Sequence, residues 1–336
     1  MSVLHTRLRI LRLSPGPPGS YGDGPEARAA GSRFDRLELA KMKIAFVGLG
    51  SMGALMARNL IRAGFSVAGY DTSPRALADF EAAGGKGAES ATAAALQADL
   101  LVLMVVSAAQ AEAVLFGAAA IDALASSGIV MLMATCPPGA VRDLGERVKS
   151  AGRRFVDAPV SGGTAGADAA TLSIMVAADD GTLDVVRPVL RAMGDKIFHV
   201  GTEPGHGAAV KTVNQLFCGI HLVAAAEGFS LARKLGLDLK VVLEILGGSS
   251  ASSWMLRDRG PRMMEAEPAV TSAVDIFAKD LGIVLEAGRE AKTALPLAAA
   301  AHQMFLAASG RGDGASDDSQ VIRSYAQLNE RAAGTP

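Results

Sequence analysis

The chain has 336 residues, of which 50% are apolar and 20% are charged, and its formal net charge is -1. This length suits one large domain or two medium-sized ones, and we expect two. The balanced charge excludes the basic surface that a nucleic-acid-binding protein needs, so the expected partner is a small molecule. The longest apolar runs, such as residues 100–109, are shorter than the roughly 20 residues of a membrane span, so no membrane partner is expected.

The two cysteines, Cys136 and Cys218, lie far apart in the sequence and lack the spacing of metal ligands. They therefore predict neither a disulfide framework nor a metal site. A reducing cytoplasm is the expected location.

Residues 1–41 are rich in Arg, Pro and Gly and have no sustained apolar periodicity, so we expect a disordered extension. Met42 stands directly before the first good strand, which favours a misplaced start codon as the origin of this extension. An arginine-rich targeting segment is the alternative, although a secretory apolar region with a cleavage site is missing. Under either explanation these residues are excluded from the fold.

From Met42 onward, short apolar runs alternate with amphipathic stretches, which is the pattern of repeated βαβ units. The predicted strands, of which the first five read as a parallel sheet, are residues 43–48, 66–71, 99–106, 128–135, 154–160, 171–178 and 196–201. After about residue 203 the periodicity is helical, and a long helix over 206–235 is apolar on nearly every side, so we expect it to be buried. The predicted fold class is α/β, with a Rossmann-type doubly wound sheet in 42–203 followed by an all-α domain in 204–330.

The first predicted strand leads into a glycine-rich turn. Its glycines have the G-x-G-x-x-G spacing, which allows a tight turn and lets the backbone approach a pyrophosphate at a helix N-terminus. The preceding strand, the following helix and an acidic residue 18 positions beyond the last glycine favour dinucleotide binding over a purely structural turn. The predicted cofactor-binding residues of this loop are Gly48, Leu49, Gly50, Ser51, Met52 and Gly53.

That acidic residue, Asp71, ends the second predicted strand and bears on the choice of cofactor. Its carboxylate can accept hydrogen bonds from both ribose hydroxyls but would repel a 2′-phosphate, so NAD is predicted over NADP. Arg75 is the competing signal, because it could turn toward a phosphate. An exposed arginine in the first turn of a helix is, however, usually just solvated.

A lysine interrupts the long apolar helix. Lys211 stands among Ala, Val, Leu, Ile and Phe residues, where a charged amine is costly unless it has a partner or a task. Asn214 and Gln215 follow three and four residues later and therefore share the helix face of Lys211. A lysine whose head reaches solvent along the helix is the purely structural alternative.

Five stretches resemble, in order, the signatures of the β-hydroxyacid dehydrogenases, the 3-hydroxyisobutyrate dehydrogenase group: GLGSMGALMARNL, DAPVSGG, TLSIMV, GHGAAVKTVNQ and KDLGIVLEAG. The resemblance runs from about residue 43 to 308 and implies an NAD-dependent dehydrogenase acting on a hydroxy carboxylic acid, as a homodimer or homotetramer. The chain departs from the family at Ala170, Ala177 and Ala178, where glycine is usual. We expect these departures to affect strand packing and to leave the chemistry alone.

Carried over by position, the resemblance makes Lys211 the general base that takes the hydroxyl proton during hydride transfer, and the general acid in reverse. Asn214 or Gln215 then positions the amine or the substrate hydroxyl, and the sequence leaves open which amide matters. Ser161 with the backbone N–H groups of the following glycines, Gly162 and Gly163, is implied to bind the substrate carboxylate.

The resemblance also implies contacts at the nicotinamide end of the cofactor. Lys279 reaches there from the helical domain, and Asp280 either holds that lysine or caps a neighbouring element. Thr135, at the end of one strand, contacts the nicotinamide ribose. Val106 and Ser107, at the end of the preceding strand, line the same crevice.

The substrate is the least determined feature. Residues 252–263 resemble the branch that oxidises L-threonate at C2, which would bring Ser252, Ser253 and Trp254 to the hydroxylated tail of the substrate. Trp254 fits a core aromatic residue as well. A 3-hydroxyisobutyrate dehydrogenase or a tartronate semialdehyde reductase would use the same lysine, serine and glycines, and a non-catalytic NAD-sensing protein is the remote alternative.

Overall fold

A computed structural model of the chain describes residues 42–329. The expected disordered extension over 1–41 and the expected domain end at 330 lie outside the described residues. The strands are β1 (Lys43–Val47), β2 (Ser66–Tyr70), β3 (Lys86–Gly87), β4 (Leu100–Leu103), β5 (Ile129–Leu132), β6 (Arg154–Asp157), β7 (Val160–Ser161), β8 (Ser173–Ala177) and β9 (Lys196–Gly201). The helices between them are α2 (Gly53–Arg62), α3 (Pro74–Ala82), α4 (Ala91–Ala95), α5 (Ala108–Glu112), α6 (Ala120–Ala123), α7 (Pro138–Ser150), α8 (Gly163–Asp168) and α9 (Asp180–Met193).

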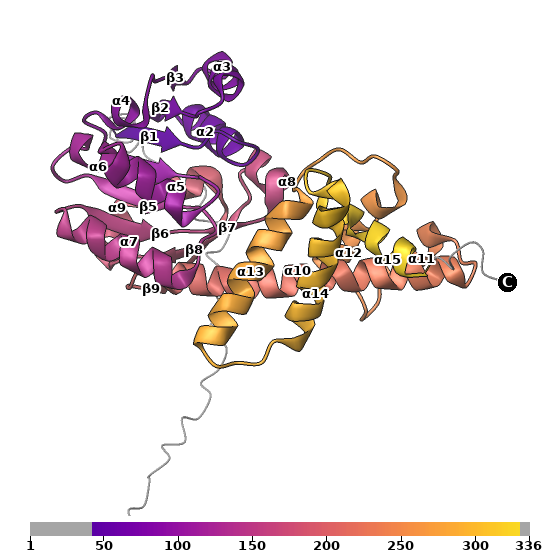
Figure 1. The fold of residues 1–336 in the computed structure, drawn as a ribbon. Coiled ribbons are helices and arrows are strands. Elements are labelled where there is room, and N and C mark those ends of the chain that lie inside the picture. Colours follow the sequence, from indigo (N-terminus) through magenta and orange to yellow (C-terminus); the bar gives the residue numbers. More distant parts are fainter. Residues whose placement is uncertain (1–41, 330–336) are drawn as a thin grey trace, which may run out of the picture.

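The strands form one sheet in the order β3-β2-β1-β4-β5-β6-β8-β7, with β9 beside β8 (Figure 1). The strands from β3 to β6 are parallel to their neighbours, whereas β8 runs antiparallel to both β6 and β7. The strand order reverses between β1 and β4, and in such sheets a ligand binds at the carboxyl ends of the strands beside this point. The predicted doubly wound Rossmann-type sheet is confirmed.

The predicted strand over 154–160 is wrong as a single element. β6 ends at Asp157, and the chain re-enters the sheet only at β7, where Val160 and Ser161 pair antiparallel with β8. Pro159 lies in the interruption and has no backbone N–H to donate to a neighbouring strand. The break turns the chain at the edge of the sheet, immediately before the predicted carboxylate-binding glycines.

Alternation along the strands builds two cores, one on each face of the sheet. In β1, Ile44 and Phe46 belong to one buried cluster, while Ala45 and Val47 belong to the other. Successive side chains of a strand point to opposite faces, so a continuous apolar run can satisfy both layers of helices. The near-continuous apolar strands of the sequence are explained by this double coverage.

The departures from the family pattern fall in two settings. Ala177 and Ala178 are buried at the end of β8, where the sequence predicted an effect on packing. Ala170 instead lies in the turn between α8 and β8 with φ of 55°. This left-handed conformation favours glycine, so the departure at Ala170 affects a turn rather than a strand.

After β9 the described chain is helical, with α10 (His206–Lys234), α11 (Leu239–Gly247), α12 (Trp254–Arg259), α13 (Val274–Glu290), α14 (Pro296–Ala308) and α15 (Ile322–Asn329). In Figure 1, α10 passes along the sheet part and continues as the axis of the helical part, with α13 and α14 packed against it. A third core, which includes Phe229, Leu281 and Phe305, lies among these helices. The predicted boundary near residue 203 falls between β9 and α10, and a division into domains 42–203 and 204–330 stays a prediction.

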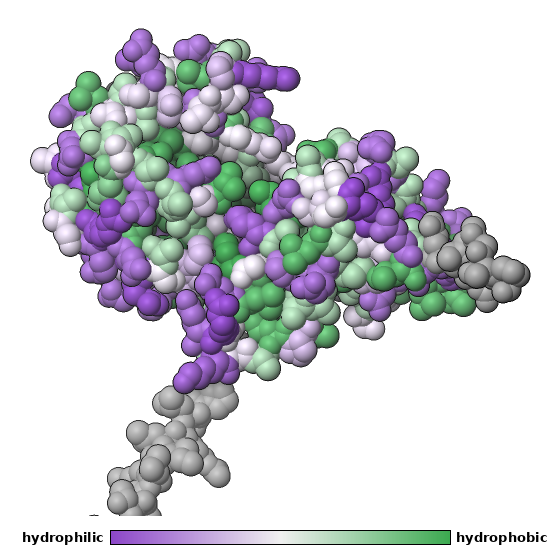
Figure 2. All heavy atoms as spheres, viewed as in Figure 1, coloured by the Kyte–Doolittle hydropathy of each residue, from purple (hydrophilic) through white to green (hydrophobic). Residues whose placement is uncertain are grey.

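The expectation that α10 is buried between other elements is met on one side of the helix and wrong on the other. By length and composition alone this helix could cross a membrane, because its most apolar window has a mean hydropathy of 1.3. Only 44% of that window is buried inside the protein. Val213, Phe217 and Leu231 are each more than half exposed. Figure 2 shows apolar residues on the surface of the helical part, including the end near α11. One side of α10 packs in the protein, and the other is an apolar surface.

Candidate active site

The glycine loop between β1 and α2 has the close contacts expected of a pyrophosphate-binding turn. Gly48 has φ of 95°, and a Cβ atom there would lie 2.4 Å from the carbonyl oxygen of Met104. A Cβ atom at Gly53 would lie 1.9 Å from the carbonyl oxygen of Gly48, so neither position accepts a side chain. A Cβ atom at Gly50 would meet no atom within 4 Å, which means that this backbone faces open space.

The start of α2 is suited to an anion. Met52 is the N-cap residue and makes no side-chain cap, and no acidic residue occupies the first turn. The first N–H groups of a helix need partners from outside it and carry a partial positive charge. Together with the open backbone at Gly50, this arrangement fits the pyrophosphate of a dinucleotide.

Asp71 follows β2 directly and ties it to the glycine loop. One carboxylate oxygen accepts a hydrogen bond from the backbone N–H of Leu49 at 2.7 Å, and the other accepts from that of Ser73 at 2.8 Å. A carboxylate oxygen has lone pairs for more than one donor, so ribose hydroxyls remain possible partners. Arg75 is almost fully exposed and lies 4.0 Å from Asp79 in a surface ion pair.

Lys279, on α13, joins the helical part to the carboxyl ends of the parallel strands. Its Nζ donates hydrogen bonds to the carbonyl oxygens of Val106, at 3.3 Å, and Thr135, at 3.1 Å. Ser107 begins α5, where its hydroxyl accepts from the N–H of Gln110. The predicted residues Val106, Thr135 and Lys279 are thus brought together, although the contacts run through main-chain oxygens.

Lys211 is only 7% exposed and lies one turn inside α10. Burial lowers the pKa of its amine, and the negative charge of Asp280 opposes this shift. No residue in the described part of the chain accepts a hydrogen bond from its Nζ. An amine that is desolvated and uncommitted is able to exchange a proton with a bound hydroxyl.

The two amides beside Lys211 face different partners. The side-chain oxygen of Asn214 accepts a hydrogen bond from Ser161 Oγ at 3.3 Å, which connects α10 to the last residue of β7. The side-chain nitrogen of Gln215 donates to Asp280 Oδ2 at 2.5 Å, which connects α10 to α13. Asn214 Nδ2 in turn donates to Gln215 Oε1 at 2.9 Å. A continuous chain of contacts therefore runs from Ser161 to Asp280.

Asp280 is 3% exposed and adjoins both lysines of the site. Its Oδ1 lies 2.9 Å from Lys279 Nζ, as the sequence suggested, but without the geometry of a hydrogen bond. It also raises the pKa of Lys211. Asp280 therefore supplies a buried negative charge beside both lysine amines of the site.

The turn after β7 presents open backbone. Gly162 has φ of 132° and Gly163 has φ of 61°, both in the region that favours glycine. A Cβ atom at Gly163 would meet no atom within 4 Å. Successive N–H groups in such a turn can form an anion-binding concavity, the role predicted for this turn beside Ser161 Oγ.

The predicted substrate-tail residues are held in contacts of their own. Ser253 caps α12, accepting a hydrogen bond from the N–H of Leu256 at 3.0 Å, and Ser252 accepts from Arg257. The indole of Trp254 is partly exposed and lies under the guanidinium of Arg259, 5.6 Å from the ring centroid. Among the described residues, no hydrogen bond, ion pair or ring contact joins these three to the Lys211 cluster.

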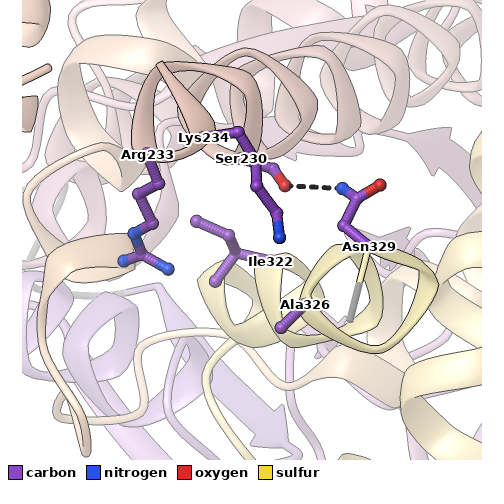
Figure 3. A pocket seen from close by; sticks show the side chains of 6 residues that line it. All are labelled: Ser230, Arg233, Lys234, Ile322, Ala326 and Asn329. Atoms are coloured by element: carbon purple, nitrogen blue, oxygen red, sulfur yellow. Dashed lines mark hydrogen bonds between the residues drawn. The ribbon is translucent and has the colours of Figure 1, made fainter. Parts of the chain in front are cut away.

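A cavity of about 170 Å³ lies at the far end of α10 (Figure 3). Its lining comes from α10 and α15: Ser230, Arg233, Lys234, Ile322, Ala326 and Asn329. Ser230 lies 19 residues beyond Lys211 along one helix, a separation of about 28 Å at 1.5 Å per residue. This cavity is therefore distinct from the cluster around Lys211. Within residues 42–329, no group of acidic, histidine or cysteine side chains is arranged to hold a metal ion.

Two known families match successive parts of the chain. Residues 43–201 match the NAD binding domain of 6-phosphogluconate dehydrogenase, and residues 205–325 match the family described as NAD-binding of NADP-dependent 3-hydroxyisobutyrate dehydrogenase. The chain is 41% identical to L-threonate dehydrogenase of Cupriavidus necator over 283 residues, 84% of this chain and 95% of that protein. It is 36% identical to 2-(hydroxymethyl)glutarate dehydrogenase of Eubacterium barkeri over 85% of this chain and 96% of that one.

Among solved structures, 3-hydroxyisobutyrate dehydrogenase from Salmonella typhimurium superimposes with a TM-score of 0.80 and 34% identity. The match covers 84% of this chain and 99% of that chain. With the family matches over residues 43–201 and 205–325, the similarity extends over both the sheet and the helices.

Proposed function

The chain belongs to the 3-hydroxyisobutyrate dehydrogenase family of NAD-dependent hydroxyacid dehydrogenases, and we propose that it oxidises L-threonate at C2 with NAD. The substrate assignment rests on the L-threonate dehydrogenases that are 35% to 41% identical to it. The site assignment rests mainly on one observation, the hydrogen bond from Ser161 to Asn214, which joins the carboxylate-binding turn to the helix of Lys211.

In this proposal the chain's own residues bind the acid and move one proton. The N–H groups of Gly162 and Gly163, with Ser161 Oγ, hold the substrate carboxylate. Lys211 Nζ, whose pKa is lowered by burial, removes the proton of the C2 hydroxyl when it is in its neutral form, and Asn214 keeps that hydroxyl in line with the amine. The bound dinucleotide supplies the acceptor for the hydride of C2, so the alcohol loses two electrons and two hydrogens and becomes a 2-oxo acid.

The experiment that tests this function is a substrate panel. L-threonate, erythronate, 3-hydroxyisobutyrate and glycerate are each offered with NAD and with NADP, and the absorbance of the reduced cofactor is followed. We expect the highest kcat/KM for L-threonate with NAD. A higher value for 3-hydroxyisobutyrate would overturn the substrate assignment alone. Absence of turnover with every acid, together with intact NAD binding, would instead support an NAD-sensing protein.

Replacing Asp280 with asparagine should move the pH profile of oxidation toward acid. Asp280 raises the pKa of Lys211, so removing its charge lowers that pKa further. Because the base must be neutral, activity rises with pH through this pKa, and the acidic limb of kcat/KM should shift to lower pH. Glu286→Gln, at an exposed carboxylate on the same helix, is the control and should leave the limb in place. An unmoved limb in Asp280→Asn would contradict the electrostatic role.

We also propose that the protein is a homodimer that pairs through α10. Its exposed apolar residues are Val210, Val213, Phe217 and Leu231, followed by Leu235, and they are separated by three, four, fourteen and four residues. Fourteen residues are two heptads, so all five lie on one stripe. This is the period of a helix–helix seam, and a straight stripe can pair with its own copy across a two-fold axis.

The proposed location is the cytoplasm. Both free cysteines fit a cytoplasmic enzyme, because thiols persist in a reducing compartment.

A charge in the stripe should dissociate this dimer. We expect Val213→Glu to behave as a monomer in light scattering coupled to size-exclusion chromatography, because two buried carboxylates would face each other across the axis. Leu297→Glu is the matched control, since Leu297 is 67% exposed on α14 and lies outside the stripe. A monomeric wild-type protein would remove the proposal, and a tetramer would require a second interface.

A further inference from the structure

Asp157 is a buried carboxylate to which the mechanism above gives no task. It ends β6, is 1% exposed, and stands opposite Ala177 of β8, where the sheet changes from parallel to antiparallel pairing. Ser161 follows it by four residues, on the chain that leads to the carboxylate-binding turn. A charged group at a fully buried position is expensive unless its hydrogen bonds are satisfied.

The partners of Asp157 are at the start of α10. Its Oδ2 accepts hydrogen bonds from the backbone N–H of Gly205 at 2.9 Å and of Ala208 at 3.0 Å. The helix's own N-cap residue, Gly205, has no side chain for this purpose and adopts a φ of 94°. Asp157 therefore caps a helix that begins 49 residues later in the sequence, at His206. Lys211 stands three residues, less than one turn, beyond Ala208.

The helix start is also pressed against the strands. A Cβ atom at Gly207 would lie 2.6 Å from the carbonyl oxygen of Met175 and 2.9 Å from that of Asp157. Neither contact can be relieved by turning a side chain, because both atoms belong to the backbone. The capping bonds and this close approach together fix both the height and the rotation of the first turn of α10 against β6 and β8.

We propose that Asp157 is a positioning residue for catalysis, one that fixes the first turn of α10 to the strand leading into Ser161 and so sets where Lys211 stands relative to the substrate carboxylate. The inference rests on the proposed function, in which Lys211 is the base and the turn after Ser161 binds the acid. The carboxylate of Asp157 links these two parts of the site. Ser161 follows Asp157 by four residues, and Lys211 follows Ala208, which donates a hydrogen bond to Asp157, by three residues.

The electrostatics support this assignment. Burial raises the pKa of Asp157 to about 6, although the N–H groups at the start of α10 lower it. The titratable groups that face it are His206, which begins α10, and Cys136, which follows β5. An apolar side chain of similar size would avoid this desolvation. The carboxylate is thus an unfavourable choice for packing alone, which favours a role in holding the helix.

The test compares capping residues of two helices. We expect Asp157→Ala to lower kcat by ~10²-fold, because small displacements of a catalytic group have effects of this size. Binding of NAD, measured by titration, should stay near the wild-type value, and the primary deuterium isotope effect on kcat should rise as hydride transfer becomes rate-limiting. Asp157→Asn keeps an oxygen acceptor for both N–H groups and should restore kcat to within about threefold of wild type, since asparagine caps helices as well as aspartate.

Asp179→Ala is the matched control. Asp179 caps α9, accepting a hydrogen bond from the N–H of Thr182 at 2.9 Å, and α9 carries no residue of the site. The Asp179→Ala variant should have a Tm a few degrees lower than wild type, because a helix cap is lost, and an unchanged kcat. Equal loss of kcat in Asp157→Ala and Asp179→Ala would overturn the inference, because a general loss of stability would then explain both.

A second variant covers the case in which Asp157→Ala does not fold. Gly207→Ala favours the helix by propensity but forces its start away from β6 and β8, so it should keep the fold and lower kcat. Wild-type kcat in Gly207→Ala, or in a folded Asp157→Ala, would refute positioning by this contact. Lys211→Ala is measured alongside. If Lys211→Ala retains turnover, the proposed function fails. If Lys211→Ala is inactive and Asp157→Ala is fully active, only the positioning role of Asp157 is refuted.

Discussion

Lys211→Ala should lower kcat by between ~10² and ~10⁴-fold, the range expected when a general base is removed. The amine is 7% exposed, burial lowers its pKa, and no described residue accepts a hydrogen bond from it. A methyl group in its place leaves the glycine loop and Asp71 untouched, so the dissociation constant of NAD should change little. Turnover is measured with the acid that the wild-type enzyme oxidises best, and NAD binding by titration.

Lys234→Ala is the matched control for this prediction. Lys234 is an exposed lysine in the last turn of the same helix, beside the distal cavity. The control should retain wild-type turnover, because it truncates a lysine of the same helix and leaves the proton-transfer group in place. Turnover in Lys211→Ala equal to that of Lys234→Ala would exclude Lys211 as the base.

Asp71→Ser should change the ratio of kcat/KM for NADP to that for NAD by about 10²-fold or more, in favour of NADP. A carboxylate beside a 2′-phosphate places like charges together, and such contacts cost several kcal/mol. The substitution also removes the bond from Leu49 N–H to the carboxylate, so NAD itself should bind less tightly. Steady-state kinetics with both cofactors measure the ratio directly.

Asp79→Ser provides the comparison for the cofactor prediction. Asp79 is an exposed aspartate on α3 that pairs with Arg75 at 4.0 Å. Its replacement frees Arg75 without altering the end of β2, so the ratio should stay near that of wild type. A ratio that is unaltered in Asp71→Ser, or altered as much in Asp79→Ser, would remove Asp71 from the choice of cofactor.

Those parts of the fold and site that depend on short stretches of sequence could be predicted. The spacing of Gly48, Gly50 and Gly53 predicts their turn, because it is determined by contacts close to the loop itself. Lys211 is conspicuous because a charge in an apolar helix contradicts its surroundings. The alternation of strand and helix likewise follows from local periodicity, which is why the doubly wound sheet was expected.

Contacts between distant segments were not predictable in this way. The sequence places Asn214 and Gln215 on one face but cannot tell that one faces Ser161 and the other Asp280. Asp157 belongs to the DAPVSGG stretch, but its capping role could not be predicted, because its hydrogen-bond partners are 48 and 51 residues away in the sequence. A carboxylate at the end of an apolar strand was the only local signal. The exposed side of α10 was not predictable, because apolar composition alone does not distinguish burial in a core from burial against another molecule.

The continuity of α10 restricts how related chains can change in length. Most connections between the halves of a protein are loops, in which an added residue is absorbed at little cost. Here the connection is a rigid rod that carries Lys211 near one end and core residues such as Phe229 near the other. One residue inserted between them would rotate one end against the other by roughly 100° and advance it by about 1.5 Å. Insertions and deletions in this lineage should therefore accumulate in surface turns and spare this helix.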